Sequence, residues 1–291
     1  MDAVITYVDG NDPFWQAEYA RTFDQPALQK RFRDWGTLPY LLRGIERFMP
    51  FVENVFLVVS SESQVPSWAS GKLRIVLHRD IIPAQLLPTF NSATIEDFLH
   101  RIPGLGERYL YFNDDMFPVG PCREDDFFRD GKASIAFRRC LSRHGIYRHH
   151  CFNSDRLARR LSGKCAGPVF RRPQHTCSPM LRSACEEVFA RAGEELARRA
   201  TPLRGYGNVN QYVFLDYMLF TGRAVPRAIP NKHVSLAHTS VTALRDCILN
   251  PSRPLVCIND VHLSEAQYTA YREAMLSSFQ ARFPVPSRFE K

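Results

Sequence analysis

Tyr109-Leu-Tyr-Phe-Asn-Asp-Asp-Met-Phe117 is the stretch of sequence that decides the fold. Its first four residues are a short apolar run typical of a buried strand, and the run ends abruptly in Asn113, Asp114 and Asp115. In open α/β sheets, ligands bind just beyond the carboxyl ends of the strands. Two adjacent carboxylates there suit a hard cation, because Mg²⁺ is commonly held by one or two carboxylates together with substrate phosphates. The alternative is a polar turn that binds nothing, since Asn and Asp are ordinary turn residues.

Two other apolar runs end in the same way. Ala3-Val-Ile-Thr-Tyr-Val8 leads directly into Asp9-Gly10-Asn11-Asp12-Pro13, and a strand followed by an acidic turn with glycine is how α/β nucleotide-binding domains begin. Near the other end of the chain, Leu255-Val-Cys-Ile258 leads into Asn259-Asp260. Chance turns would not readily supply three such patterns, so we expect these acidic turns to converge on one site.

Strand-like and helix-like segments alternate along the first half of the chain, which predicts βαβ units and a mixed, mostly parallel sheet with helices on both faces. Pro13 should open a helix with Asp12 as its N-cap, and Ser264 with Gln267 forms a capping box at the start of the last helix. Further strands are expected at residues 54–59, 73–77 and 133–137. Further helices are expected at residues 38–48, 92–100, 179–199, 208–220 and 264–283.

Length and composition fit one integrated domain over residues 1–291. The chain is 45% apolar, enough for a full core, but it has no membrane-length apolar stretch and no leader of a basic segment before an apolar one. We therefore expect a cytoplasmic protein, with a peripheral position at the inner face of the membrane as the alternative. The eight cysteines form no Cys-x-x-Cys pair, so we expect reduced thiols rather than a zinc site or a disulfide framework.

The net charge of +8 is concentrated in the middle third of the chain. We interpret residues 120–173 as a basic insertion or lid, between a core at 1–119 and a C-terminal part at 174–291. No nucleic-acid motif accompanies these arginines, and the aromatic residues form no obvious stacking platform, so nucleic acid is not an expected partner. An anionic substrate or an acidic membrane surface fits better; a solvated basic face is the plain alternative.

Four blocks of sequence together resemble the Stealth family, which includes bacterial capsular-polysaccharide sugar-phosphate transferases and the catalytic part of animal N-acetylglucosamine-1-phosphotransferase. The first block is Asp2 to Asp12, and the second runs from Leu38 to Phe117 and contains Tyr111-Phe-Asn-Asp-Asp-Met-Phe117. The third surrounds His175 and reaches Arg204, and the fourth is Cys257-Ile-Asn-Asp260. The N-terminal extension common in the family is not expected here, because the chain starts at the first block.

The resemblance implies a Rossmann-like, nucleotide-sugar-binding fold of the GT-A type and a hexose-1-phosphate transferase. Such an enzyme moves a sugar-1-phosphate, here expected to be an N-acetylhexosamine-1-phosphate, from a UDP-sugar to a saccharide hydroxyl in capsule or exopolysaccharide synthesis. It releases UMP and forms a phosphodiester.

The resemblance also implies roles for individual residues. Mg²⁺ or Mn²⁺ would be held by Asp114, Asp115, Asp260 and Asn259. His175 would act as general base, with Arg204 and Asp115 as further catalytic residues; a structural histidine is the alternative for His175. The residues expected to bind substrate are Asp9, Asn11, Asp12, Arg43, Asn91 and Asn208.

Several of these roles have plainer alternatives. Helix capping is the alternative for Asp12 and Asn91, and a surface ion pair is the alternative for Arg43. The rival activity is a metal-dependent glycosyltransferase of the GT-A type, which would release UDP instead of UMP. A non-catalytic module that binds an anionic polymer would need no metal, and a relative that has lost activity is a third alternative.

Overall fold

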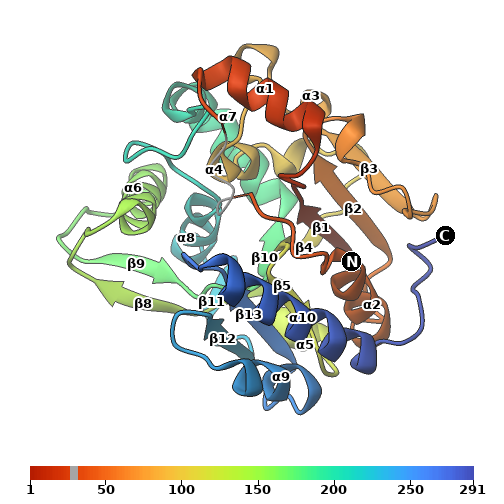
Figure 1. Ribbon diagram of the computed structural model, residues 1–291. Coiled ribbons are helices and arrows are strands. Elements are labelled where there is room, and N and C mark those ends of the chain that lie inside the picture. The colour runs from red at the N-terminus through yellow and green to blue at the C-terminus, as the bar shows by residue number, and fades with distance from the viewer. Residues whose placement is uncertain (27–31) are drawn as a thin grey trace.

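The computed structural model describes residues 1–26 and 32–291 and is built around a five-stranded sheet of order β10-β4-β1-β2-β3 (Figure 1). The strands β1, β2, β3 and β4 are parallel, while β10 lies antiparallel on the edge beside β4. The mixed, mostly parallel sheet expected from the sequence is confirmed. The bounds are β1 (Asp2–Thr6), β2 (Asn54–Val59), β3 (Leu73–Leu77), β4 (Arg108–Asn113) and β10 (Ser178–Leu181).

The strand order reverses between β1 and β4. From β1 the chain moves outward through β2 to β3, then returns to place β4 on the other side of β1. Thr6 lies opposite Asn113 in this pairing, so both strands end at the same edge of the sheet. A reversal of strand order opens a crevice at the carboxyl edge, where ligands bind in open α/β sheets.

A second sheet meets the first at Asp114 and Asp115. This three-stranded sheet has the order β12-β13-β5, and its strands are β5 (Met116–Pro118), β12 (Asn231–Ser235) and β13 (Leu255–Asn259). Because β4 ends at Asn113 and β5 begins at Met116, the two aspartates occupy the corner where the chain passes from one sheet to the other. The Ile258 amide donates to the Asp115 carbonyl oxygen at 2.9 Å, which joins the end of β13 to this corner.

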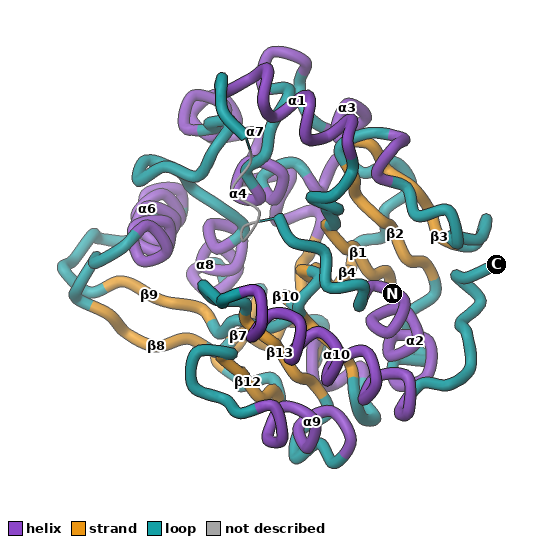
Figure 2. The backbone as a smooth tube through the Cα atoms, viewed as in Figure 1, coloured by secondary structure: helices purple, strands orange, loops and turns teal. Residues whose placement is uncertain are grey.

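The basic middle segment forms a wall beside these sheets. Figure 2 shows β8 (Phe137–Cys140) and β9 (Phe170–Pro173) as a two-stranded ribbon near α6 (Ile146–Leu161). These two strands pair antiparallel, and α6 packs against α8 (Tyr212–Phe220). A third small sheet of order β11-β7-β6 consists of β6 (Phe128–Arg129), β7 (Lys132–Ile135) and β11 (Ala224–Pro226). The division of the chain at residues 119 and 173 stays a prediction.

Most expected helices are present. The structure has α1 (Pro13–Phe23), α2 (Leu38–Phe48), α3 (His78–Ile81), α4 (Ser92–Glu96), α5 (Glu124–Phe127), α7 (Arg182–Arg199), α9 (Val241–Leu249) and α10 (Glu265–Arg282). Short 3₁₀ helices are η2 (Glu62–Gln64), η3 (Ala84–Leu86) and η4 (Leu99–Arg101). The Ser264–Gln267 capping box is confirmed. Gly44 of α2 lies so close to β5 that an added Cβ would be 2.3 Å from the Pro118 carbonyl oxygen, which explains a glycine within a helix.

Three expected helices were wrong in their extent, and one of them, expected at residues 208–220, begins only at Tyr212. The helix expected to reach His100 ends at Glu96, because the Phe98 amide bonds to the Ile95 carbonyl oxygen and tightens the chain into 3₁₀ geometry. The helix expected to begin at Pro179 begins at Arg182, and Pro179 belongs instead to β10. An edge strand tolerates a proline, which has no N–H, because positions on the outer side of the strand have no ladder partner.

Candidate active site

A cavity of about 1210 Å³ opens at the carboxyl edge of β1 and β4. Its walls come from the ends of β1, β4 and β13, from the segment around His175, and from β8 and β9. The acidic turns after β4 and β13 therefore do converge on one site, as the sequence predicted. Of the residues that the sequence singled out, the cavity is lined by Asn113, Asp114, Asp115, His175, Arg204, Asn259 and Asp260.

Carboxylates crowd one side of the cavity. Burial raises the pKa of Asp114 to about 7, and the neighbouring charges of Asp115, Asp34 and Asp260 add to this effect. Burial also raises the pKa of Asp260, with Asp115 again contributing. Four carboxylates that repel one another within one cavity are a natural site for a cation, because a bound divalent ion would reverse the sign of the local field.

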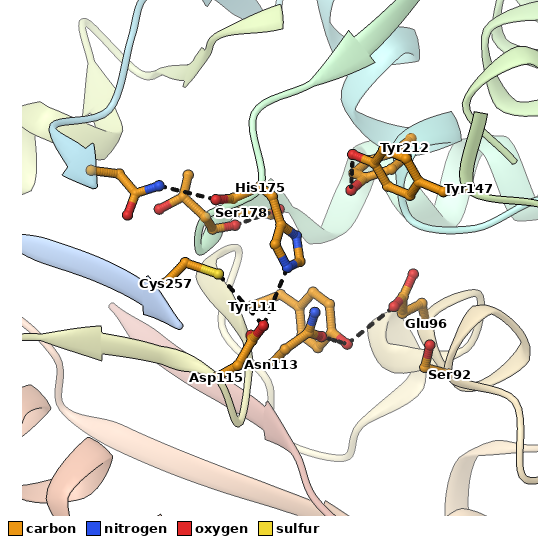
Figure 3. A network of polar contacts seen from close by, with 12 residues as sticks. Ser92, Glu96, Tyr111, Asn113, Asp115, Tyr147, His175, Ser178, Tyr212 and Cys257 are labelled. Carbon is orange, nitrogen blue, oxygen red and sulfur yellow. Dashed lines mark hydrogen bonds and ion pairs between the residues drawn. The ribbon is translucent and has the colours of Figure 1, made fainter. Parts of the chain in front are cut away.

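Figure 3 shows the Asp115 carboxylate beside the side chains of His175 and Cys257. Its Oδ2 atom is 3.4 Å from His175 Nε2 and 3.5 Å from Cys257 Sγ. These three donor atoms all lie within 4.8 Å of one another, so the trio could hold a metal ion. Its other oxygen, Oδ1, is buried without a hydrogen-bond partner among the described residues. An unpartnered buried carboxylate oxygen is costly unless a ligand or an ion satisfies it.

The cysteines were expected to be reduced thiols rather than a zinc site or a disulfide framework. All eight are free, as expected. Cys257 is buried outside the cavity lining, and its sulfur lies 3.5 Å from Asp115 Oδ2. No spacing motif marks this cysteine, and only the pairing of β13 with β5 brings it to the corner that holds Asp115.

His175 pairs with Asp115 at the boundary of the cavity. Burial alone would lower the pKa of His175, but the hydrogen bond and charge of Asp115, with a smaller contribution from Glu96, raise it. The backbone of His175 is held in turn, because the Asn231 side chain donates to its carbonyl oxygen at 3.0 Å. An imidazole beside a carboxylate can accept and release a proton near neutral pH.

A buried polar network supports this side of the cavity (Figure 3). The Tyr111 hydroxyl lies 2.6 Å from Asn113 Oδ1, 3.3 Å from Glu96 Oε1 and 2.9 Å from Thr6 Oγ1. Burial raises the pKa of Glu96, while the charge of Arg204 opposes that effect. The network fixes the Asn113 side chain at the end of β4 and places a carboxyl group near both Arg204 and His175.

Arg204 reaches the cavity from a loop that two buried asparagines hold in place. Its Nη2 atom donates to Ser92 Oγ at 2.6 Å. Asn91 caps α4, accepting from the Ala93 amide at 3.1 Å, and its amide nitrogen donates to Asn208 Oδ1 at 3.1 Å. Asn208 also accepts from the Gly205 amide at 2.7 Å. Asn91 and Asn208 are both buried outside the cavity lining, so they position Arg204 and do not reach a ligand there.

The side chains of the acidic turn after β1 bond within the turn, to α1 and to η2, outside the cavity lining. Asp12 caps α1 through the Phe14 amide at 3.0 Å and also accepts from Ser63 and Gln64. Asp9 accepts from the Asn11 amide at 2.8 Å within the turn. Neither Asp9, Asn11 nor Asp12 lines the cavity, so the structure favours helix capping and turn formation over the substrate-binding roles expected from the sequence.

Arg43 was also expected to bind substrate, and the structure corrects this. Its guanidinium forms a bidentate ion pair with Glu290, at 2.9 Å from Nε to Oε1 and 2.6 Å from Nη2 to Oε2. A third bond runs from Nη1 to the Phe283 carbonyl oxygen at 2.7 Å. Arg43 lies outside the cavity lining because this partner at the other end of the chain holds it against α10.

Sequence reasoning missed several residues of the cavity. Asp34 lies in the loop between α1 and α2, where no strand or motif announces it, yet it lines the cavity and burial raises its pKa. Tyr7 and His233 line the cavity as well. Tyr7 directly follows β1, so the rule that ligands bind beyond the carboxyl ends of strands could have found it. Asp34 and His233 carry no comparable signal.

The chain is similar in sequence to proteins named polysaccharide phosphotransferases. Residues 31–135 match the model of Stealth protein conserved region 2. Over its whole length the chain is 29% identical to the capsular polysaccharide phosphotransferase WcwK of Streptococcus pneumoniae and covers 99% of that protein. It is 32% identical, again over its whole length, to an exopolysaccharide phosphotransferase of Streptomyces coelicolor and covers 57% of it.

The extent of these matches differs. The chain spans a little over half the length of the Streptomyces relative and of the exopolysaccharide phosphotransferase CpsY of Mycobacterium tuberculosis, at 57% and 58%. A solved galactosyltransferase, LgtC, in complex with donor and acceptor sugar analogues, aligns with 99% of this chain and 98% of its own at 12% identity and a TM-score of 0.41. Among the described helices, none has the length and apolar character needed to cross a membrane.

Proposed function

The chain belongs to the Stealth family, and from that premise we propose that it transfers a sugar-1-phosphate from a UDP-sugar to a saccharide hydroxyl. The acceptor oxygen would attack the sugar-side phosphorus of the donor. One phosphorus–oxygen bond forms to the acceptor, the bond to the bridging oxygen breaks, and UMP leaves. The relatives' names, which describe capsular and exopolysaccharide phosphotransferases, support a phosphodiester-bearing polysaccharide as the product.

The observation that carries the proposal is the composition of the cavity. Carboxylates of Asp114, Asp115 and Asp260 lie on one side, with His175 and Arg204 beside them. Phosphoryl transfer requires mainly positioning and charge neutralisation from a protein, and this set supplies both. A non-catalytic module that binds anions would gain nothing from a cluster of mutually repelling carboxylates in its binding cavity.

The residues present fit a divalent cation. Asp115 Oδ1 is buried without a hydrogen-bond partner in the described part of the chain, and burial beside other carboxylates raises the pKa of Asp114. Asp114, Asp115 and Asp260, with the amide oxygen of Asn259, would hold Mg²⁺ or Mn²⁺. When bound, such an ion would neutralise charge on the donor diphosphate.

His175 would take the proton from the acceptor hydroxyl. Its bond to Asp115 orients the ring and stabilises the imidazolium that proton uptake creates. Arg204, held by Ser92, would neutralise charge on the transferred phosphoryl oxygens, since a guanidinium can donate two parallel hydrogen bonds. Asn113, fixed by Tyr111, would orient the donor at the end of β4.

The test is the identity of the released nucleotide. Purified protein would be incubated with UDP-N-acetylglucosamine, Mg²⁺ and an oligosaccharide acceptor, and UMP and UDP would be separated by chromatography. We expect metal-dependent release of UMP, reduced at least a hundredfold by Asp115→Asn. Asp246→Asn is the matched control, because this acid is exposed on α9 outside the cavity. Release of UDP would instead identify a glycosyltransferase.

A further inference from the structure

Two pairs of arginines face each other across the two-stranded ribbon formed by β8 and β9. Arg138 lies opposite Arg172, and Arg139 lies opposite Arg171. Like charges directly opposite on neighbouring antiparallel strands destabilise a sheet. A two-stranded sheet is weakly stable by itself. Two such pairs in one ribbon therefore need counter-charges from outside it.

The ribbon has two faces, and α6 supplies an acidic partner on one of them. Side chains alternate along a strand, so the Arg139–Arg171 pair and the Arg138–Arg172 pair point to opposite faces. Arg171 pairs with Asp155 of α6 at 3.3 Å, and its guanidinium lies 4.3 Å from the centre of the Phe220 ring. Asp155 is almost fully buried and also pairs with Arg159, so Arg171 has a counter-charge within the protein, whereas Arg139 is exposed.

The other face turns its charge toward the cavity. Both Arg138 and Arg172 line it, and neither has an acidic partner among residues 1–26 and 32–291 closer than 4.0 Å. The cavity thus joins a wall of carboxylates to a wall with two uncompensated guanidinium groups. At about 1210 Å³ it also exceeds the range of roughly 300–1000 Å³ typical of a site for one small ligand, which leaves room for an acceptor beside the donor.

We propose that Arg138 and Arg172 form a binding site for a phosphodiester group of the acceptor saccharide, so that the protein favours acceptors that already carry its own linkage. This inference rests on the proposed function, because each transfer leaves a phosphodiester one sugar away from the new terminal hydroxyl groups. Carboxylates with a cation, together with Arg204, suffice for the donor diphosphate. Arg138 and Arg172 then supply the second anion site, since guanidinium groups bind phosphate oxygens in a bidentate manner.

The test compares two defined probes that differ only in linkage. One is a tetramer of N-acetylglucosamine joined by phosphodiesters, and the other is the same tetramer joined by glycosidic bonds, each with a fluorophore at its reducing end. Binding would be measured by fluorescence anisotropy for the wild type, Arg172→Gln and Arg138→Gln/Arg172→Gln. Arg139→Gln is the matched control, because it removes the same charge from the same ribbon but from the opposite face.

We expect the wild type to bind the phosphodiester tetramer at least tenfold more tightly, and this preference to fall about tenfold in Arg172→Gln and further in the double variant. Arg139→Gln should keep it. Equal loss in Arg139→Gln and Arg172→Gln would overturn the proposal, since only bulk charge would matter. A higher KM for the UDP-sugar in Arg172→Gln or the double variant, with an unchanged preference for the phosphodiester tetramer, would also overturn the proposal. It would assign the arginine pair to the donor.

The two proposals can fail separately. Anisotropy measures binding without turnover, whereas the proposed function is tested by UMP release from the wild type. A wild type that prefers the phosphodiester tetramer but releases no UMP with any donor would refute the transferase and retain the anion site. UMP release without any preference for the phosphodiester tetramer would support the transferase and refute the anion site.

Discussion

Replacing Arg43 with methionine should destabilise the protein and leave its affinity for the donor unchanged. Methionine keeps the apolar stem of the side chain but removes the charge and both bonds to Glu290. The pair is nearly buried, with the Arg43 and Glu290 side chains 12% and 9% exposed. Glu290 also accepts from the Ser287 amide and hydroxyl, so this pair anchors the C-terminal segment to α2.

The size of the effect follows from burial. Breaking a buried ion pair costs about 3–5 kcal/mol, and the residual exposure of both groups favours the low end, about 3 kcal/mol. Unfolding entropies of about 2.1 cal/mol/K per residue correspond to about 0.6 kcal/mol per degree for a chain of this length. The midpoint of thermal unfolding should therefore fall by about 5 °C.

Urea unfolding of the wild type, Arg43→Met, Glu290→Gln and the double variant measures the coupling between the two residues. We expect the double variant to lose less than the sum of the single losses, because neither partner is then left as a buried unpaired charge. The KM for the UDP-sugar should match the wild type. A raised KM with unchanged stability would refute this reasoning and return Arg43 to the donor site.

The pH dependence of the same variants has a definite sign. Burial would raise the pKa of Glu290, but hydrogen bonds from Arg43 and Ser287 outweigh it and hold the pKa below its ordinary value of 4.5. A carboxyl group with a lowered pKa contributes stability above its unfolded pKa and loses it as the pH falls through its folded pKa. The difference in unfolding free energy between wild type and Arg43→Met should therefore be constant near neutral pH and shrink as the pH falls through the range in which folded Glu290 takes up a proton.

Four further predictions concern the cavity and its walls. Adding Mg²⁺ or Mn²⁺ at a hundred times its dissociation constant should stabilise the protein by about 2.7 kcal/mol; an unshifted melting curve would contradict the cation site. Asp114→Asn should raise the melting temperature by roughly 2 °C in metal-free buffer at pH 8, because it removes one of several repelling charges, and should abolish the stabilisation by metal; a lower melting temperature would contradict this. Arg172→Gln should raise the unfolding free energy by about 0.5 kcal/mol in urea, since it relieves the repulsion from Arg138, and a loss of stability would show that the arginine is satisfied internally. Tyr111→Phe should cost about 1.5 kcal/mol and lower kcat, whereas Tyr109→Phe on the same strand, whose hydroxyl has only a weak contact with sulfur at 3.6 Å, should cost less than half as much; equal losses would argue against the polar network.

The residues that sequence reasoning found are those whose signal is local. Asp114 and Asp115 follow an apolar run that could only be a buried strand, and parallel strands bring such ends to one edge. Asp260 carries the same local pattern at the end of β13. Its convergence with Asp115 was expected, although β13 belongs to a separate sheet that meets the first only through the corner at β5.

The residues that were missed or misplaced depend on contacts far apart in the chain. Arg43 occupies a polar position of α2, and nothing near it in sequence announces Glu290, which lies 247 residues away. Asp34 lies in a loop with no periodic pattern. Pro179 carries no strand signal, because the four residues Ser178–Leu181 are too few to show the alternation of a strand.

The fate of the donor's sugar-side phosphorus tests sugar-phosphate transfer most directly. Donor UDP-N-acetylglucosamine would be incubated with the protein, Mg²⁺ and an oligosaccharide acceptor, and the reaction followed by ³¹P nuclear magnetic resonance. We expect a new phosphodiester signal on the saccharide product that grows in step with UMP, and we expect both to be lost in Asp115→Asn. A product free of phosphorus, with UDP accumulating in its place, would contradict it.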